Sequence, residues 1–170
     1  MLRLIFAFVD IMLHRRGPDS LPSSQFLFWV LFPLSIVADF LVLSLAGSPG
    51  RVFAVGLLVA GFDIWFVWAL LRTFNRQARF RQTMVALLGA SVIINVIRAP
   101  ITPLLAAADP ENRPPIPSLV AIFTIVWAMD IMAFVFSRAL ERPYLLCVAI
   151  VIGYALLMES LRVTLLQPVT

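Results

Sequence analysis

Five hydrophobic runs, each about 20 residues long, constrain the fold of this chain more than any other feature of its sequence. They occupy residues 26–48, 51–72, 83–106, 117–137 and 143–166. An α-helix rises 1.5 Å per residue, so a run of this length crosses the ~30 Å hydrocarbon core of a bilayer. No segment alternates apolar and polar residues as a strand would, and none repeats another at a fixed period. The sequence therefore predicts an all-α, polytopic membrane helical bundle with five transmembrane helices over residues 23–170.

The composition supports a membrane protein. Of the 170 residues, 62% are hydrophobic and 13% are charged, whereas soluble domains contain about 45–50% apolar and about 25% charged residues. Five spans and their connections use most of the chain, so no sizeable soluble domain is expected. These proportions exclude an ordinary soluble globular protein.

The segment before the first run, residues 1–22, has the pattern of an amphipathic interfacial helix followed by a linker. At 100° per residue, Arg3, Asp10 and His14 fall on one narrow stripe, and the other directions are apolar. The prolines in the following GPDSLPSS end this helix. We expect the helix to lie in the headgroup layer of the membrane or to dock on the other helices.

All 13 basic residues are arginine, and their positions predict the orientation of the chain in a membrane. With the N-terminus inside, nine arginines lie on the cytoplasmic side, three lie outside and Arg98 lies within a span. We expect a cytoplasmic N-terminus and a periplasmic C-terminus in a bacterial inner membrane, since a lysine-free, arginine-rich composition suits a bacterial source. The arginines follow the ends of hydrophobic runs and form no basic face, which argues against nucleic-acid binding.

Four arginines closely follow the second run, in the stretch RTFNRQARFRQ. This cluster suits contact with anionic lipid headgroups, where each basic side chain near the membrane surface contributes about 1 kcal/mol. The alternative is that the cluster serves only as a topology signal. The candidate lipid-contact residues are Arg72, Arg76, Arg79 and Arg81.

Each predicted span carries at least one ionisable side chain, although a charge at the centre of a membrane helix costs about 2.5–3.5 kcal/mol. Such side chains must face the interior of the bundle or lie near an interface. In the third span, polar residues at spacings of three and four share one helix face that includes Asn95 and Arg98. We expect an intramembrane polar network formed by Asp39, Asp63, Asn95, Arg98, Asp130, Glu159 and Arg162.

Depth in the membrane predicts one particular pair in this network. Counted from the outer ends of their spans, Arg98 and Glu159 both lie about seven or eight residues deep, which is ~11 Å at 1.5 Å per residue. Because a buried charge without a partner is strongly destabilising, we expect these two side chains to form an ion pair.

Three interpretations of the intramembrane carboxylates remain open. They hydrogen-bond between helices and hold the bundle together, or they dock a partner subunit. In the third interpretation, Asp39, Asp63 and Asp130 form a proton or ion path with Arg98 as the counter-charge. The spacing of the residues does not separate these interpretations.

The inventory of reactive side chains argues against an enzyme. His14 is the only histidine and Cys147 is the only cysteine, which excludes a histidine-rich metal site, a bis-histidine haem and a Ser-His-Asp triad inside the membrane. The chain contains no HExxH, no GxSxG and no glycine-rich phosphate loop. We therefore expect no enzymatic activity, no metal and no cofactor.

One stretch is similar to a known family. Residues 74–105, FNRQARFRQTMVALLGASVIINVIRAPITPLL, together with the amphipathic N-terminal helix, the proline break and the five spans, resemble bacterial members of the YIP family of small five-span membrane proteins. The resemblance implies an integral membrane adaptor without catalytic residues. It does not extend to the long soluble N-terminal region of the eukaryotic members, which work in membrane trafficking.

The sequence favours a non-enzymatic scaffold, assembly factor or accessory subunit of a larger membrane complex. Its expected partners are membrane lipids and either another integral membrane protein or further copies of the same chain. The alternative is a small oligomeric transporter, or a proton or ion conduit, that uses the intramembrane carboxylates.

Overall fold

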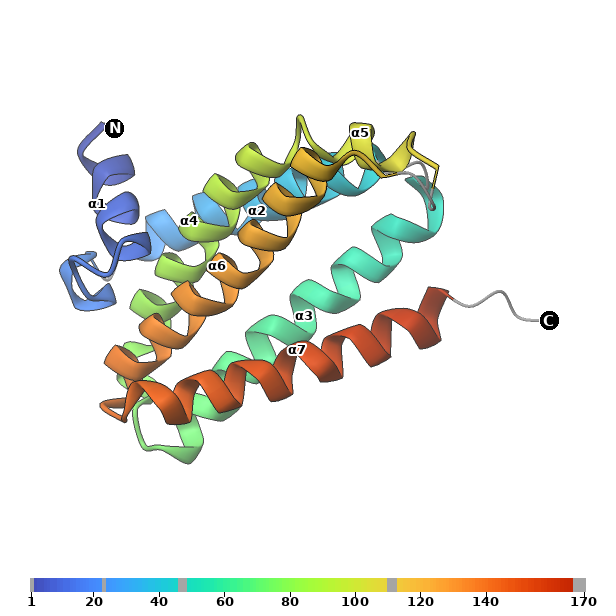
Figure 1. Cartoon of the computed structure of the whole chain (residues 1–170). Coiled ribbons are helices and arrows are strands. Elements are labelled where there is room, and N and C mark those ends of the chain that lie inside the picture. The colour runs from blue at the N-terminus through green and yellow to red at the C-terminus, as the bar shows by residue number, and fades with distance from the viewer. Residues whose placement is uncertain (1, 23, 46–48, 110–112, 167–170) are drawn as a thin grey trace.

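The computed structural model of this protein describes residues 2–22, 24–45, 49–109 and 113–166, and these residues form helices joined by short connections (Figure 1). Five segments of the described residues are long and apolar enough to cross a membrane, and they lie in α2, α3, α4, α6 and α7. The prediction of an all-helical chain with five such helices is confirmed for this part of the chain. The elements are α1 (Leu2–Met12), the 3-10 helix η1 (Pro18–Ser20), α2 (Gln25–Leu45), α3 (Pro49–Thr73), the 3-10 helix η2 (Gln77–Arg79), α4 (Phe80–Arg98), α5 (Thr102–Ala106), α6 (Pro115–Leu140) and α7 (Tyr144–Leu166).

The long helices form two layers (Figure 1). In one layer α4 packs between α2 and α6, and α3 and α7 form the other layer, where α3 packs mainly on α2 and α7 mainly on α6. The connection from α3 to α4 and the connection from α6 to α7 lie at the same end of the bundle. We call this the arginine-rich end, because Arg76, Arg79, Arg138 and Arg142 lie in or beside these two connections.

Helix α4 is the most buried of the long helices and forms the centre of the bundle. It contacts α2 and α6 in its own layer, α3 in the other layer, and α1. Its buried residues include Ala86, Gly89 and Ala90, whose small side chains let neighbouring helices approach closely. The outer helices expose many large apolar side chains, as a surface in contact with lipid requires.

The N-terminal helix α1 docks on α4 and α6, which is one of the two placements expected from its sequence. Phe8, Ile11 and Met12 of its apolar side are buried. The ring of Phe8 lies directly over Gly89, where an added Cβ atom would stand 2.3 Å from the ring. The indole nitrogen of Trp127 donates a hydrogen bond of 3.3 Å to the carbonyl oxygen of Met12. The side chain of Arg3, predicted for the polar stripe, lies outside the described residues.

The third predicted run, residues 83–106, contains two helices. Helix α4 ends at Arg98, and the short α5 begins at Thr102 after one turn. Proline disfavours helical backbone in the residue before it and lacks an amide hydrogen. Pro100 and Pro103 therefore explain why the long helix ends here.

Candidate functional sites

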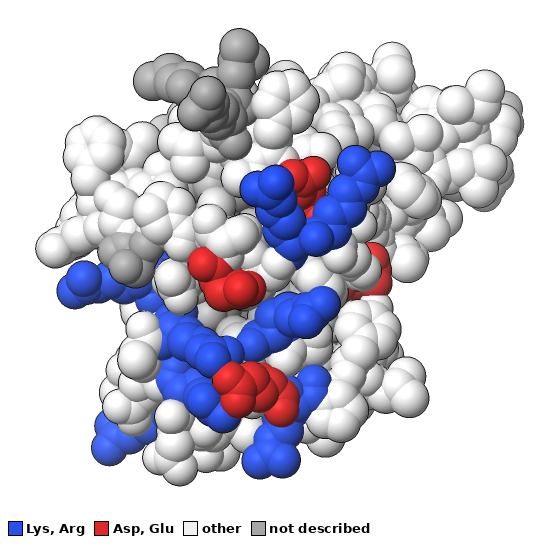
Figure 2. Space-filling view, turned by 90° about the vertical axis from the view of Figure 1, so that its left-hand side faces the viewer, with Lys and Arg blue, Asp and Glu red and all other residues white. Residues whose placement is uncertain are grey.

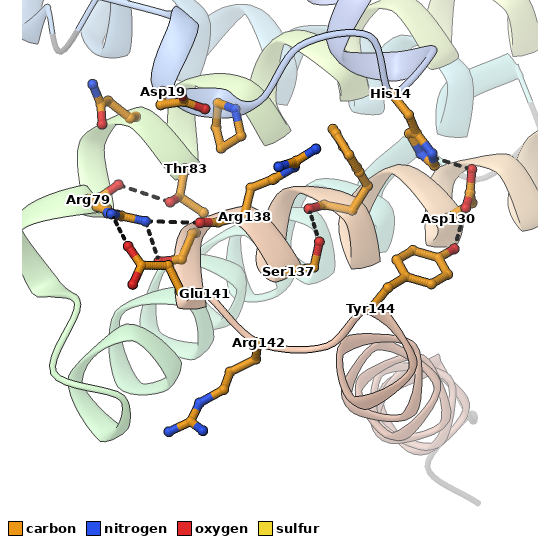
Figure 3. A pocket seen from close by; sticks show the side chains of 14 residues that line it. His14, Asp19, Arg79, Thr83, Asp130, Ser137, Arg138, Glu141, Arg142 and Tyr144 are labelled. Atoms are coloured by element: carbon orange, nitrogen blue, oxygen red, sulfur yellow. Dashed lines mark hydrogen bonds and ion pairs between the residues drawn. The ribbon is translucent and has the colours of Figure 1, made fainter.

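A polar pocket with a volume of about 870 Å³ opens at the arginine-rich end. Figure 2 shows this end of the molecule, where arginine and acidic side chains gather on the surface. The walls of the pocket come from the segment between α1 and α2, the start of α4, the second half of α6 and the start of α7 (Figure 3). The lining residues are His14, Pro18, Asp19, Arg79, Gln82, Thr83, Asp130, Phe134, Ser137, Arg138, Ala139, Glu141, Arg142 and Tyr144.

Glu141 joins the two connections at this end. Its carboxylate accepts hydrogen bonds from both Arg76 and Arg79. Arg79 also donates to the carbonyl oxygens of Arg138 at 2.9 Å and Ala139 at 3.3 Å. Arg79 thus satisfies carbonyl groups at the C-terminus of α6, where a positive charge is also favoured by the helix dipole.

The four arginines predicted to contact lipid have different surroundings. Arg76 and Arg79 are held by Glu141, whereas the guanidinium of Arg72 lies 4.9 Å from the centroid of the Trp68 ring. Arg81 is exposed and lies outside the polar pocket. Contact of these residues with lipid stays a prediction.

At the other side of the pocket, Asp130 is bound by two side chains from distant parts of the sequence. The Nε2 atom of His14 lies 3.2 Å from one carboxylate oxygen, and the hydroxyl of Tyr144 donates to the other. The His14 ring stacks on Phe134, with centroids 4.2 Å apart. Asp130 therefore belongs to the polar pocket and not to a central group with the other predicted carboxylates.

Three non-glycine residues at this end, His14, Asn75 and Glu141, adopt left-handed backbone conformations with φ of 60°, 57° and 55°. Each follows or caps the C-terminus of a helix, where this conformation closes the last turn. It costs most residues about 1–2 kcal/mol. The amide hydrogen bonds that close the turns run from Arg15 to Asp10 at 2.8 Å, from Arg76 to Leu71 at 2.7 Å and from Arg142 to Ser137 at 3.2 Å.

Two arginines of this pocket lie near aromatic rings, which the sequence did not indicate. In the sequence, Arg138 and Arg142 are two of the nine arginines expected on the cytoplasmic side. The structure places their guanidinium groups 5.4 Å from the ring centroids of Phe134 and Phe74, respectively. The signal that could have identified them is the pairing of two arginines with one glutamate in a connection between two spans.

A second, smaller cavity of about 180 Å³ lies between the two helix layers, and we call it the interlayer cavity. Asp39 of α2 and Asp63 of α3 both line it. The amide nitrogen of Asn95 donates a hydrogen bond of 2.6 Å to Asp39, and the hydroxyl of Tyr154 donates to Asp63. The structure thus brings two of the predicted network residues, Asp39 and Asp63, to one cavity, and a third, Asn95, contacts Asp39.

The predicted ion pair between Arg98 and Glu159 is wrong. Within the described residues these two side chains form no ion pair, and Glu159 is exposed on α7. The physical reason is lateral position, since α7 packs mainly against α6 and not against α4. The side chain of Arg162, also predicted for the network, lies outside the described residues.

Comparison with known proteins finds no matching family model, no matching curated protein and no matching solved structure. The function is therefore inferred from the geometry of the two cavities. The polar pocket offers guanidinium groups, carboxylates and hydroxyls, which recognise ions and polar headgroups. The interlayer cavity offers two carboxylates, Asp39 and Asp63, on apolar walls.

Proposed function

We propose that this protein is a non-enzymatic, multi-pass component of a bacterial inner membrane that acts as a scaffold, assembly factor or accessory subunit of a larger complex. Its arginine-rich end and N-terminus face the cytoplasm, where the basic side chains contact anionic lipids. The partner is another integral membrane protein. The observation that carries the proposal is the exposed carboxylate of Glu159 on α7.

Glu159 lies on a helix surface that is otherwise suited to lipid. Leu156, Leu157 and Val163 are exposed around it, and Glu159 stands roughly 22 Å along α7 from its start at 1.5 Å per residue. A charged side chain facing hydrocarbon costs about 2.5–3.5 kcal/mol at a helix centre, and Glu159 has a smaller cost because it lies near the end of the candidate span Tyr144–Leu161. A transmembrane helix of a partner that carries a basic or hydrogen-bond-donating side chain at this depth would remove much of that cost.

Purification from native membranes in a mild detergent tests this proposal. The wild-type protein is expected to bring down a membrane protein in fixed stoichiometry, and Glu159→Gln is expected to lose most of it. Asp109→Asn removes an equal charge outside the predicted spans and serves as the matched control. A stable monomer without any accompanying protein would contradict the proposal.

The second candidate is a small oligomeric transporter or a proton or ion conduit, which is favoured by the presence of Asp39 and Asp63 on one cavity. In reconstituted vesicles this function requires that Asp63→Asn abolishes flux without loss of folding. Asp130→Asn, which changes a carboxylate of the polar pocket, should retain the flux. Unchanged flux in Asp63→Asn would remove this candidate.

A further inference from the structure

Arg138 extends into the middle of the polar pocket (Figure 3). Its guanidinium lies 5.4 Å from the centroid of the Phe134 ring, a cation–π arrangement that helps to hold it there. Within the described part of the chain the Arg138 side chain forms no ion pair, whereas Arg79 is used by Glu141 and by two carbonyl groups. The planar donors of Arg138 therefore remain available to a ligand.

The carboxylates of the pocket differ in what they offer to a ligand. Glu141 is held by two arginines, and Asp130 is bound by His14 and Tyr144. Asp19 enters the pocket from η1, on the wall opposite Tyr144 (Figure 3). A ligand at Arg138 thus meets one further carboxylate, which accepts hydrogen bonds from a hydroxyl or an amine.

Neutral hydrogen-bonding groups line the same pocket. Gln82 uses one N–H of its amide to donate to the carbonyl oxygen of Leu21 at 3.3 Å and has a second N–H to offer. Ser137 lies beside Arg138, and its hydroxyl oxygen has lone pairs beyond the donor bond of 2.8 Å to Phe134. These groups complement a ligand with several oxygen atoms.

The size and position of the pocket indicate a headgroup-sized ligand. About 870 Å³ lies within the range of roughly 300–1,000 Å³ that small-molecule sites occupy. The pocket opens at the end of the predicted spans, and the neighbouring Leu145 and Leu146 at the start of α7 are exposed. An apolar surface beside a polar pocket suits a molecule with a polar head and an apolar tail.

We propose that the polar pocket binds a phosphate ester and that Arg138 is the residue that contacts the phosphate oxygens. Guanidinium groups bind phosphate through two parallel hydrogen bonds, which are stronger than bonds between neutral groups. The substituent on the phosphate carries a hydroxyl or an amine that faces Asp19. The ester belongs to a phospholipid headgroup or to a small soluble phosphate, and the site is independent of the partner proposed for α7.

Native mass spectrometry of the full-length protein in detergent tests this site. Phosphatidylglycerol is titrated as the lipid probe, and sn-glycerol 3-phosphate as the soluble probe. Arg138→Gln is expected to weaken binding by about tenfold or more, since hydrogen bonds to a charged group contribute about 1.5–3 kcal/mol. Arg138→Lys, which keeps the charge but loses the planar donor pair, should show an intermediate loss.

Arg113→Gln is the matched control, because it removes the same charge from an exposed residue that lies outside the pocket and is not one of the candidate lipid-contact residues. It should bind as the wild type does, and thermal unfolding of each variant checks that folding is retained. Binding of phosphatidylglycerol without competition by sn-glycerol 3-phosphate assigns the site to a lipid, and competition assigns it to a soluble ester. Binding of neither probe, or equal losses in Arg138→Gln and Arg113→Gln, would overturn the proposal.

Discussion

His14 has an unfavourable backbone conformation, and its side chain makes contacts in the polar pocket. It stands at the left-handed position after α1, where glycine is the usual residue. Its side chain stacks on Phe134 and lies within 3.2 Å of Asp130. The structure thus combines an unfavourable backbone conformation with two contacts that glycine could not make.

Two substitutions separate these opposing effects. His14→Ala removes the contacts and keeps the strained conformation, whereas His14→Gly removes the contacts and relieves the strain. His14→Ala is therefore expected to lower the free energy of unfolding by about 1 kcal/mol more than His14→Gly does. Thermal unfolding in detergent measures the difference, and equal melting temperatures would show that the left-handed turn stores no strain.

The sequence showed which polar residues lie in the predicted spans. It did not show which side chains these residues contact. Asp130 was singled out as a polar residue in a span, but its partners come from elsewhere in the chain, His14 from the segment after α1 and Tyr144 from the start of α7. Arg98 and Glu159 were paired by depth alone, and depth does not say which helices are neighbours. Side-chain pairs between helices depend on lateral packing, which hydrophobic periodicity does not encode.

At the scale of helices, the docking of α1 depends on the close contact between Phe8 and Gly89. An added Cβ atom at this glycine would lie 2.3 Å from the ring, so the ring and its helix would have to move. Overpacking of this kind typically costs about 1–3 kcal/mol. Part of this cost should appear as undocking of α1.

Gly89→Ala is expected to speed tryptic cleavage after Arg15 or Arg16, which follow α1 and are exposed. An increase of about fivefold or more in the cleavage rate corresponds to the lower end of the overpacking cost. Gly153→Ala is the control, because nothing lies within 4 Å of a Cβ atom added there. Equal cleavage rates in the two variants would contradict the docking contact.

The sequence predicted the long helices well, because their length and hydrophobicity follow directly from the thickness of a bilayer. It gave the third run as one segment over residues 83–106, whereas α4 ends at Arg98, just before Pro100 and Pro103. For α1 it left two placements open. Only the contacts of Phe8, Ile11 and Met12 with the bundle decide between them, and these contacts are tertiary.

At the scale of the whole molecule, Arg76, Arg79, Arg138 and Arg142 gather at one end of a two-layered bundle, the end that Figure 2 shows. The sequence predicted that the cluster after the second run lies on the same side as the short connection between the last two runs. It could not predict that Glu141 joins these connections or that a pocket forms between them. Residues about 60 positions apart meet there, and such meetings arise only when the helices pack.

The central claim is that five helices cross a membrane with the arginine-rich end in the cytoplasm. Labelling of single cysteines with a membrane-impermeant thiol reagent tests it most directly. Cys147 is first replaced by alanine, and cysteine is then placed at Gln77, just before α4, or at Ala108, just after α5. Ala108→Cys should react in intact cells and Gln77→Cys only after the cytoplasmic side is opened, whereas the reverse pattern, or labelling of both from one side, would contradict the account.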